Sequence, residues 1–321
     1  MPVSERKLID RIRRQVGRGR NRWVVAGIGD DCSILRLPPG HEALVTTDFS
    51  LEGIHFRRDW HPPEVVGHRC LTRGLSDVAA MGGQPLAAFL SLALPARLPQ
   101  SWIDRFMKGF LRLSKEFGVV LAGGDTAESP DGILADIMIV GSTPRGRALR
   151  RSEARPGDRI WVTGDLGGSA AAIAELRKRR GNVRAADYPR HYFPVPRLEV
   201  GRVLRERSLP SAMIDLSDGL STDLAHICQE SGTGAAIREE SVPRASVGRP
   251  ARGVDLRLAL HGGEDYELLF TAHRDAKVPK YIAGVRVTEI GRITRQKGLS
   301  LQHRSGVSTA LLPHGWEHFQ R

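Results

Sequence analysis

The chain has 321 residues, of which 40% are hydrophobic and 26% are charged. This is the composition of a folded globular protein, and at roughly 100–200 residues per domain the length favours two domains. The three cysteines are far apart and form no CxxC pair, which excludes a disulfide framework and a cysteine-rich zinc site and favours a reducing, cytoplasmic setting. The most apolar run, residues 86–96, is shorter than the ~20 residues of a membrane span. The charged N-terminus predicts no secretory signal.

The net charge is +12, from 48 Lys and Arg against 36 Asp and Glu. A positive balance of this size would suit nucleic-acid binding, because Lys and Arg neutralise phosphates. The basic residues are scattered, however, and their densest clusters carry neither an aromatic RNA-binding pattern nor a zinc-finger spacing. A small anionic ligand explains the charge equally well. We therefore expect no specific nucleic-acid partner and no membrane, and we keep a basic RNA-binding protein as an alternative.

Hydrophobic periodicity predicts the elements of the first half of the chain. A short helix is expected at residues 4–17, with Ser4 as its N-cap. Two longer helices are expected at residues 63–81 and 101–117, where apolar residues recur at spacings of three and four. Strand-like runs predict strands at residues 23–28, 43–47, 86–94, 119–122 and 133–141.

A stretch rich in Arg, Pro and Gly predicts a domain boundary near residue 147, which gives domains 1–147 and 148–321. The second domain begins with a strand, a glycine turn and an Ala-rich helix, the order that opens an α/β unit. The predicted elements are a strand at 159–163, a turn at 164–168, a helix from Ser169, a strand at 212–215, a helix at 220–230 and a strand at 266–271. The fold class expected is α/β (α+β), and no fixed-period repeat is present.

A set of aspartates points to chemistry. Each lies in a short Gly, Ser or Thr segment behind an apolar run: Asp30, Asp31, Asp48, Asp77, Asp125, Asp215 and Asp218. A single Asp in such a turn is most simply a cap or an Asx-turn. Five segments of this kind, each behind a predicted strand or helix, are expected to converge on one cleft at the rim of a sheet.

Converging carboxylates repel one another and need compensating cations. Oxygen ligands without Cys or His favour Mg²⁺ or Mn²⁺, and Mg²⁺ held by carboxylates usually shares phosphate oxygens. The neighbouring glycines let backbone N–H groups approach those phosphates. The residues therefore predict a multi-metal phosphate site, most simply for a nucleotide, although the chain has neither a Walker A loop nor the kinase HRD and DFG motifs.

Three further residues suggest a second ligand beside the metals: His55, Glu264 and Trp316. A carboxylate and an aromatic face suit a cationic heterocycle. The structural alternatives are a surface histidine, a strand-edge glutamate and an aromatic residue that packs the tail.

In this order, the motifs resemble the thiamine-monophosphate kinase family. The resemblance extends from residue 27 to residue 319 and rests on GIGDDC, TTD with EGIHF, LSDVAAMG, GGDT, GRALRRS, DLSDGL, GGEDYEL and GWEHF. The wider superfamily of aminoimidazole-ribotide synthetase-like ATP enzymes shares only part of this set. The resemblance implies a two-domain aminoimidazole-ribotide synthetase-like fold, with N-terminal domains that pair into a dimer barrel and ATP in the cleft between the domains.

The resemblance also implies a reaction and a site. The γ-phosphoryl group of ATP would pass directly to thiamine monophosphate, with several Mg²⁺ ions as cofactors and without a phospho-enzyme or a side-chain base. Carried over by motif, the metal ligands are Asp31, Thr46, Thr47, Asp48, Asp77, Asp125, Asp215 and Asp218. The ATP contacts are Gly124, Asp125, Arg151 and Ser217, with Met107 as a further candidate, and the substrate contacts are His55, Glu264 and Trp316.

The chain departs from the family pattern in two places. Gly74 stands where the family usually has Asn, which would loosen a turn or remove a polar contact, and Glu317 replaces an Asp. The pair Arg150 and Arg151 leaves the phosphate-binding arginine open by one residue. The alternatives are an amidine-forming synthetase, a selenophosphate synthetase, whose reactive cysteine would here have to be Cys32, and a binding protein without catalytic activity.

Overall fold

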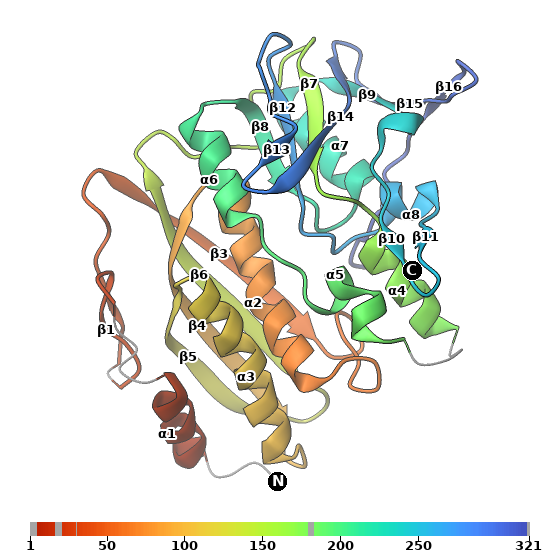
Figure 1. Ribbon diagram of the computed structural model, residues 1–321. Helices are drawn as coiled ribbons and strands as arrows, with labels where there is room; N and C mark the ends of the chain where they lie inside the picture. Colours follow the sequence, from red (N-terminus) through yellow and green to blue (C-terminus); the bar gives the residue numbers. More distant parts are fainter. Residues whose placement is uncertain (1–4, 17–20, 30, 179–182, 320–321) are drawn as a thin grey trace. The chain divides into compact units, whose positions relative to one another are not determined.

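The computed structural model describes residues 5–16, 21–29, 31–178 and 183–319 (Figure 1). Its contacts divide the chain into two units, residues 1–78 with 83–146, and residues 79–82 with 147–321. No helix in the described part of the chain is both long and apolar enough to cross a membrane.

The N-terminal unit is a four-stranded sheet with helices on one face. Its elements are α1 (Glu5–Val16), β1 (Val24–Ala26), β2 (Ile34–Leu35), β3 (His41–Leu51), α2 (Pro63–Ala80), β4 (Gln84–Pro95), α3 (Gln100–Glu116), β5 (Val120–Ser129) and β6 (Leu134–Pro144). The strand order is β3-β6-β4-β5, with β4 and β5 parallel and the other pairs antiparallel. Figure 1 shows α2 and α3 side by side across one face of this sheet.

Two glycines allow α2 and α3 to pack in direct backbone contact. A Cβ atom on Gly67 of α2 would lie 2.0 Å from the carbonyl oxygen of Phe106, and one on Gly109 of α3 would lie 1.9 Å from the carbonyl oxygen of Glu64. Real Cβ atoms do not approach so closely, so both positions require glycine. Tight packing follows, and Phe106 and Phe110 are fully buried beside it.

The C-terminal unit is a largely antiparallel sheet with helices around it. Its strands are β7 (Arg159–Thr163), β8 (Pro210–Asp215), β9 (Gly234–Arg238), β10 (Ser246–Val247), β11 (Arg252–Gly253), β12 (Leu268–Ala272), β13 (Tyr281–Ile282), β14 (Val285–Thr294), β15 (Gly298–Gln302) and β16 (Ser308–Ala310). Its helices are α4 (Gly168–Arg177), α5 (Pro189–Tyr192), α6 (Leu198–Glu206), α7 (Leu220–Ser231) and α8 (Leu256–His261), with 3-10 turns at Ala185–Asp187 and Glu239–Ser241.

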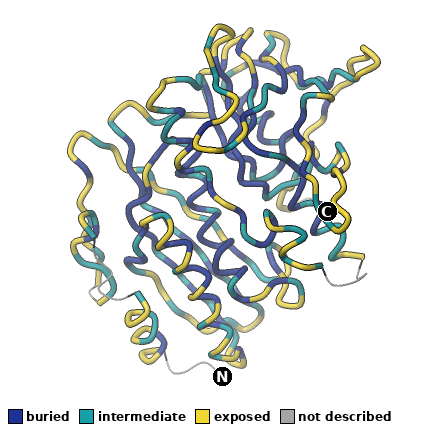
Figure 2. Tube along the Cα trace, in the orientation of Figure 1, coloured by how far each residue is buried: buried dark blue, intermediate teal, exposed yellow. Residues whose placement is uncertain are grey.

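The main sheet of this unit has the order β16-β15-β9-β14-β7-β12-β8, and β13 pairs with β14. Only β15 and β9 are parallel among its described pairs. The apolar side chains of β7, β8 and β12 pack with those of α7 in one buried core, which includes Val162, Ile214, Leu224 and Leu269. Figure 2 shows these strands largely buried, whereas α1 and β16 are largely exposed.

The structure confirms the mixed α and β class and the predicted helices and strands, with changed bounds. The predicted strand 43–47 extends over His41–Leu51, and the strand 119–122 continues through the GGDT motif to Ser129. The first helix begins by Glu5, and its expected cap Ser4 lies outside the described residues. The strands β2, β9 to β11 and β13 to β16 and the helices α5, α6 and α8 were not predicted from the sequence.

We expect Gly109→Ala to lower the free energy of unfolding by about 1–3 kcal/mol, because the new methyl group would force α3 away from α2. This loss would outweigh the gain of up to about 1 kcal/mol that alanine brings to a helix interior. Urea unfolding of the two proteins measures the difference.

Gly253→Ala is the matched control, because a Cβ atom there would meet nothing within 4 Å. Equal stability of the Gly109→Ala and Gly253→Ala variants would contradict the backbone contact between the helices.

Candidate active site

The helix-covered face of the N-terminal sheet brings two of the predicted segments together. Thr46 on β3 donates a hydrogen bond from Oγ1 to Oδ2 of Asp77 on α2. Two residues further along β3, Asp48 forms an ion pair with Arg73 of α2, at 3.5 Å between Oδ1 and Nη1. Thr46 and Asp48 are two residues apart on β3, and their partners are four residues apart on α2. Both pairs therefore lie at the same interface between strand and helix.

These aspartates do not stand in turns at strand ends, as the sequence suggested. Asp48 lies inside β3, opposite Ile137 of β6, and Asp77 lies inside α2. Asp125 lies inside β5, opposite Ser91 of β4. The strands continue because Thr and Val flank the motifs and favour extended backbone.

Gly74 also lies inside α2 rather than in a turn. A Cβ atom at this position would be 2.6 Å from Cγ1 of Ile139 on β6. The glycine therefore lets α2 lie directly on the sheet. This departure from the family pattern affects the packing of the helix and not the conformation of a turn.

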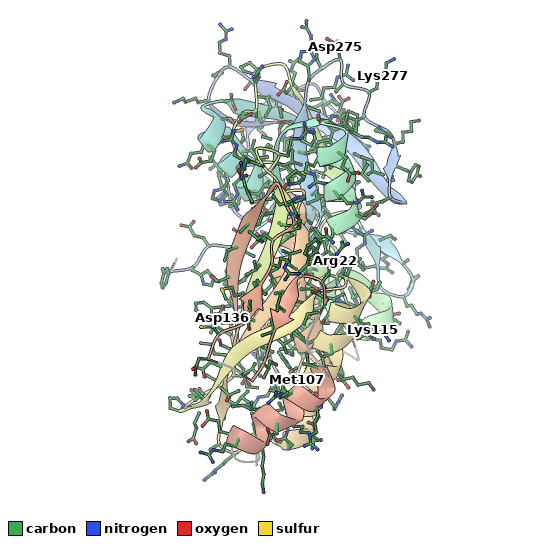
Figure 3. All side chains as sticks on the ribbon, turned by 90° about the vertical axis from the view of Figure 1, so that its left-hand side faces the viewer. Arg22, Met107, Lys115, Asp136, Asp275 and Lys277 are labelled. Atoms are coloured by element: carbon green, nitrogen blue, oxygen red, sulfur yellow. The ribbon has the colours of Figure 1, made fainter. Side chains whose placement is uncertain are left out.

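Strand alternation places two further predicted ligands, Thr47 and Asp125, on the opposite face. Thr47 alternates with Thr46 and Asp48, and it is exposed where they are half-buried. Asp125, Ser91 and Asp136 occupy neighbouring strands in one row. Burial raises the pKa of Asp136. Figure 3 shows Asp136 on the opposite side of this sheet from Met107 and Lys115, which belong to α3.

A cavity of about 570 Å³ brings together Asp31, Gly124 and Asp125. Its walls are α1, residues 27–29 and 31–33, β4 and β5, and its lining includes Ile9, Ile12, Cys32, Phe89 and Leu121. Gly124 has φ +148°, and a Cβ atom there would lie 1.9 Å from the carbonyl oxygen of Leu90, so this position admits only glycine. Asp30, the neighbour that we did not choose as ligand, lies outside the described residues.

His55 is half-buried in the turn that follows β3. Its Nδ1 accepts a hydrogen bond from the backbone N–H of Leu51 at 3.0 Å. Because Nδ1 accepts, the neutral ring carries its proton on Nε2. That nitrogen is then a donor, as a contact to an anionic substrate requires.

In the C-terminal unit, the turn after β8 brings four predicted residues together. The backbone N–H of Glu264 donates to the carbonyl oxygen of Ser217 at 2.7 Å, and that of Trp316 donates to the carbonyl oxygen of Asp218 at 2.9 Å. Asp215 ends β8 and is 3% exposed. Glu264 has φ +64° and Tyr266 has φ +50°, so this segment is held in a sparsely populated conformation. Trp316 is 45% exposed.

Asp223 is a buried acid of this turn that sequence reasoning missed. Its Oδ2 accepts hydrogen bonds from the N–H groups of Asp218 at 3.2 Å and Gly219 at 3.0 Å. Burial, followed by the charges of Asp215 and Asp218, raises the pKa of Asp223 well above its usual range. The charges of Asp215 and Asp218 therefore act on Asp223 at the start of α7. The sequence pattern that could have indicated Asp223 is an acidic residue in the first turn of the helix predicted at residues 220–230.

The GGEDYEL segment also carries two inward carboxylates. Asp265 accepts a hydrogen bond from the N–H of Gly167 at 2.7 Å, and burial raises its pKa to about 7. Glu267 is buried between Arg190 at 2.6 Å and Arg197 at 2.5 Å and accepts a hydrogen bond from Oγ1 of Thr163 at 2.6 Å. These two acids are part of the scaffold that supports Glu264.

The arginines of the GRALRRS motif differ in their surroundings. Arg150 forms an ion pair with Glu153. Arg151 is exposed and has no ion-pair partner among the described residues. Met107, a further candidate for contact with ATP, is 1% exposed in α3 and packs in the core.

The predicted metal ligands are divided between the two units, with Asp215 and Asp218 in the C-terminal one and the other six in the N-terminal one. Within the described residues, no group of three Asp, Glu, His or Cys side chains is arranged to hold a metal ion. The full ligand set stays a prediction. Arg73 was also missed, although it lies four residues before Asp77, on the same helix face.

The fold and these motifs define a class of ATP-dependent enzymes. Residues 29–143 match the family model of the AIR synthase related protein N-terminal domain, and residues 155–304 match that of its C-terminal domain. The architecture of two mixed α/β units is therefore the one that the sequence predicted.

Curated relatives narrow the class. Thiamine-monophosphate kinase of Salmonella typhimurium is 38% identical over 307 residues, 92% of each chain, and that of Escherichia coli K12 is 39% identical over 309 residues, also 92% of each. The structure of thiamine-monophosphate kinase from Stenotrophomonas maltophilia is 36% identical, with a TM-score of 0.82 over 94% of this chain and 97% of that one. The complex of AaThiL with AMPPCP and TMP is 31% identical, with a TM-score of 0.77 over 99% of both chains. The chain belongs to the thiamine-monophosphate kinase family.

Asp265 makes the stability of the C-terminal unit depend on pH. Its pKa is about 7 in the folded chain against 3.8 for an ordinary Asp. Between these values the unfolded chain releases a proton that the folded chain retains, so rising pH favours unfolding by up to about 1.4 kcal/mol per pH unit. Asp265→Asn keeps an acceptor for Gly167 and removes this effect. Relative to the native chain, we expect the variant to gain about 2–3 kcal/mol between pH 5 and pH 7.

Urea unfolding at the two pH values measures this gain. Asp275→Asn is the control, because the side chain of Asp275 is 76% exposed. An identical pH dependence of the native chain and the Asp265→Asn variant would show that Asp265 is ionised throughout.

Proposed function

We propose that this chain transfers the γ-phosphoryl group of ATP to thiamine monophosphate and forms thiamine diphosphate and ADP, in the biosynthesis of thiamine diphosphate. One observation carries the proposal: the likeness to thiamine-monophosphate kinases extends over nearly the whole chain, and one of these relatives forms a complex with AMPPCP and TMP. The same relatives count against an amidine-forming synthetase, a selenophosphate synthetase and an RNA-binding protein. We assign the reaction to the cytoplasm.

We assign metal and ATP binding to both domains, 1–147 and 148–321. Gly124 and Asp125 line the cavity beside Asp31, where their backbone N–H groups could donate to phosphates. Arg151, exposed and without an ion-pair partner in the described part of the chain, would neutralise phosphate charge. Ser217 lies in the turn after β8, between Asp215 and Asp218.

Several Mg²⁺ ions suit the donors of these segments. Asp31, Thr46, Thr47, Asp48, Asp77, Asp125, Asp215 and Asp218 would hold them. All offer oxygen, the ligand atom that Mg²⁺ prefers. When bound, Mg²⁺ would neutralise the charge of the two phosphorylated substrates.

The thiamine monophosphate site would comprise His55, Glu264 and Trp316. The Nε2–H group of His55 can donate to a phosphate oxygen, while Glu264 and the exposed indole of Trp316 suit a cationic ring. Glu264 and Trp316 are anchored to adjacent carbonyl groups of one turn, which supports their joint role.

The chemistry needs positioning more than proton transfer. Both substrates are anions, so their repulsion is the main barrier, and Arg151 and the acid-bound cations would lower it. The acceptor is a phosphate oxygen with a pKa of about 6, so it is largely ionised at pH 7 and needs no general base. We therefore propose direct in-line transfer without a phospho-enzyme.

The direct test is ATP turnover with thiamine monophosphate as acceptor. We expect thiamine diphosphate and ADP in equal amounts, complete loss of turnover with EDTA and recovery with added Mg²⁺. Turnover with another acceptor but not with thiamine monophosphate would refute the assignment. An acid-stable phosphoprotein that forms and decays during turnover would refute direct transfer.

The proposed roles predict different kinetic effects in the N-terminal unit. Asp48→Ala and Asp77→Ala should lower kcat by at least about 10²-fold, since they would remove proposed ligands of the cations that offset the negative charge of the transition state. His55→Ala should mainly raise the KM for thiamine monophosphate, by about 10-fold, because it removes one hydrogen bond to a charged group.

Asp59→Ala is the control for these variants, since Asp59 is an exposed carboxylate paired with Arg57. Equal losses of kcat for Asp48→Ala, Asp77→Ala and His55→Ala would contradict the division of roles.

We also propose that two copies pair through the open face of the N-terminal sheet. Val45 is 63% and Phe49 is 53% exposed on this face of β3. Phe49→Lys would remove the burial of one Phe from each copy, about 3–6 kcal/mol in all, and should raise the dimer dissociation constant by at least about 100-fold.

Analytical ultracentrifugation measures this effect, with Tyr281→Lys as control, because Tyr281 is 64% exposed in the C-terminal unit. A monomeric native chain, or a dimer unchanged by Phe49→Lys, would contradict the pairing.

A further inference from the structure

The segment that carries Trp316 is bound to the first turn of α7 by three backbone donors. The N–H of His314 lies 3.4 Å from Oγ of Ser221, that of Gly315 lies 3.0 Å from Oγ1 of Thr222, and that of Trp316 lies 2.9 Å from the carbonyl oxygen of Asp218. We call residues 314–316 the C-terminal strap. Two side-chain hydroxyls of α7 therefore accept hydrogen bonds from it.

Gly315 brings the strap into direct contact with the turn. A Cβ atom at this position would lie 2.3 Å from the carbonyl oxygen of Asp218 and 2.5 Å from Oγ1 of Thr222. Any larger residue would therefore displace the strap. Trp316 is the next residue, so the contact of Gly315 also holds the backbone of Trp316 beside the turn.

The same turn fixes Glu264 from its other side. Oγ of Ser221 lies 2.8 Å from Nδ1 of His261, and the rings of His261 and His314 lie 5.5 Å apart at 70°. His261 precedes the Gly262-Gly263 pair that leads to Glu264, whose N–H donates to Ser217. Ser221 thus contacts both segments that flank the turn, and Thr222 contacts the C-terminal strap.

We infer that Ser221 and Thr222 are positioning residues for thiamine monophosphate. Their hydroxyls hold the strap so that the half-exposed indole of Trp316 has a fixed place relative to Glu264 before the substrate arrives. Because the C-terminal strap is already ordered, it loses little chain entropy when the substrate binds. The two hydroxyls therefore raise the affinity for the thiamine moiety. In the described part of the chain, the Thr222 hydroxyl accepts from Gly315 and not from Ser217 or Arg151, the ATP contacts assigned to the C-terminal unit, so we expect the affinity for ATP to depend on it less. This inference rests on the proposed function.

The test is the kinetics of Thr222→Val, which keeps the shape of the side chain and removes the acceptor for Gly315. We expect the KM for thiamine monophosphate to rise about 10-fold, the size of one lost hydrogen bond to a positioned group, with kcat and the KM for ATP within about twofold. Thr294→Val is the matched control, because Thr294 donates only to the carbonyl oxygen of Gln296 at the far end of β14.

A double-variant cycle separates positioning from general stability. Trp316→Ala removes the indole that the strap positions. Thr222→Val should therefore have no further effect on the KM for thiamine monophosphate in the Trp316→Ala background. Additive effects, or equal rises in the KM for ATP, would overturn the inference. A native chain that fails to use thiamine monophosphate would overturn the proposed function as well, whereas an active native chain with an unchanged Thr222→Val variant would overturn only the role of Thr222.

A readout without turnover keeps the inference testable if a variant is inactive. Release of the strap should speed chymotryptic cleavage after Trp316 in Thr222→Val and in Gly315→Ala, followed by mass spectrometry, but not in Thr294→Val. Equal cleavage rates in all four proteins would show that the strap does not depend on these contacts.

Discussion

The structure depends on the way in which its carboxylates are compensated. An acid removed from water is stable only when charges or N–H groups replace the lost hydration. Glu267 has two arginines and a threonine hydroxyl. Asp265 and Asp223 accept hydrogen bonds from backbone N–H groups, but burial raises the pKa of both, so their charged forms are compensated only in part. These acids keep the C-terminal unit in the one conformation that presents Glu264.

A second group of acids lies in the segments assigned to metal and ATP. Asp31 and Asp125 line a cavity, and Asp215 and Asp218 add their charge to that of Asp223. Their negative potential is suited to cations that accompany phosphorylated ligands. One motif can serve both the fold and the proposed chemistry. In GGEDYEL, Glu264 is a proposed substrate contact, and the neighbouring buried acids Asp265 and Glu267 support its backbone.

Close backbone contacts provide the rigidity that this arrangement needs. Gly67 and Gly109 join α2 to α3, and Gly315 joins the C-terminal strap to the turn at Asp218. In each case, a methyl group would overlap a carbonyl oxygen. Small residues at these points let elements distant in sequence carry site residues at fixed separations, which a flexible loop could not do.

The sequence by itself determined the helices α2 and α3, the long strands of the N-terminal unit, the strands β7, β8 and β12, the mixed fold class and the order of the motifs, since period and propensity are local properties. It also singled out Thr46 with Asp77, and Ser217 and Asp218 with Glu264 and Trp316, which the structure brings together. Only the tertiary structure decided that Asp48 and Asp125 lie within strands, that Thr47 faces away from Thr46, and that Asp223, Asp265 and Arg73 serve as partners. Sheet order, strand register and burial arise from contacts between distant segments, and no local pattern of residues specifies them.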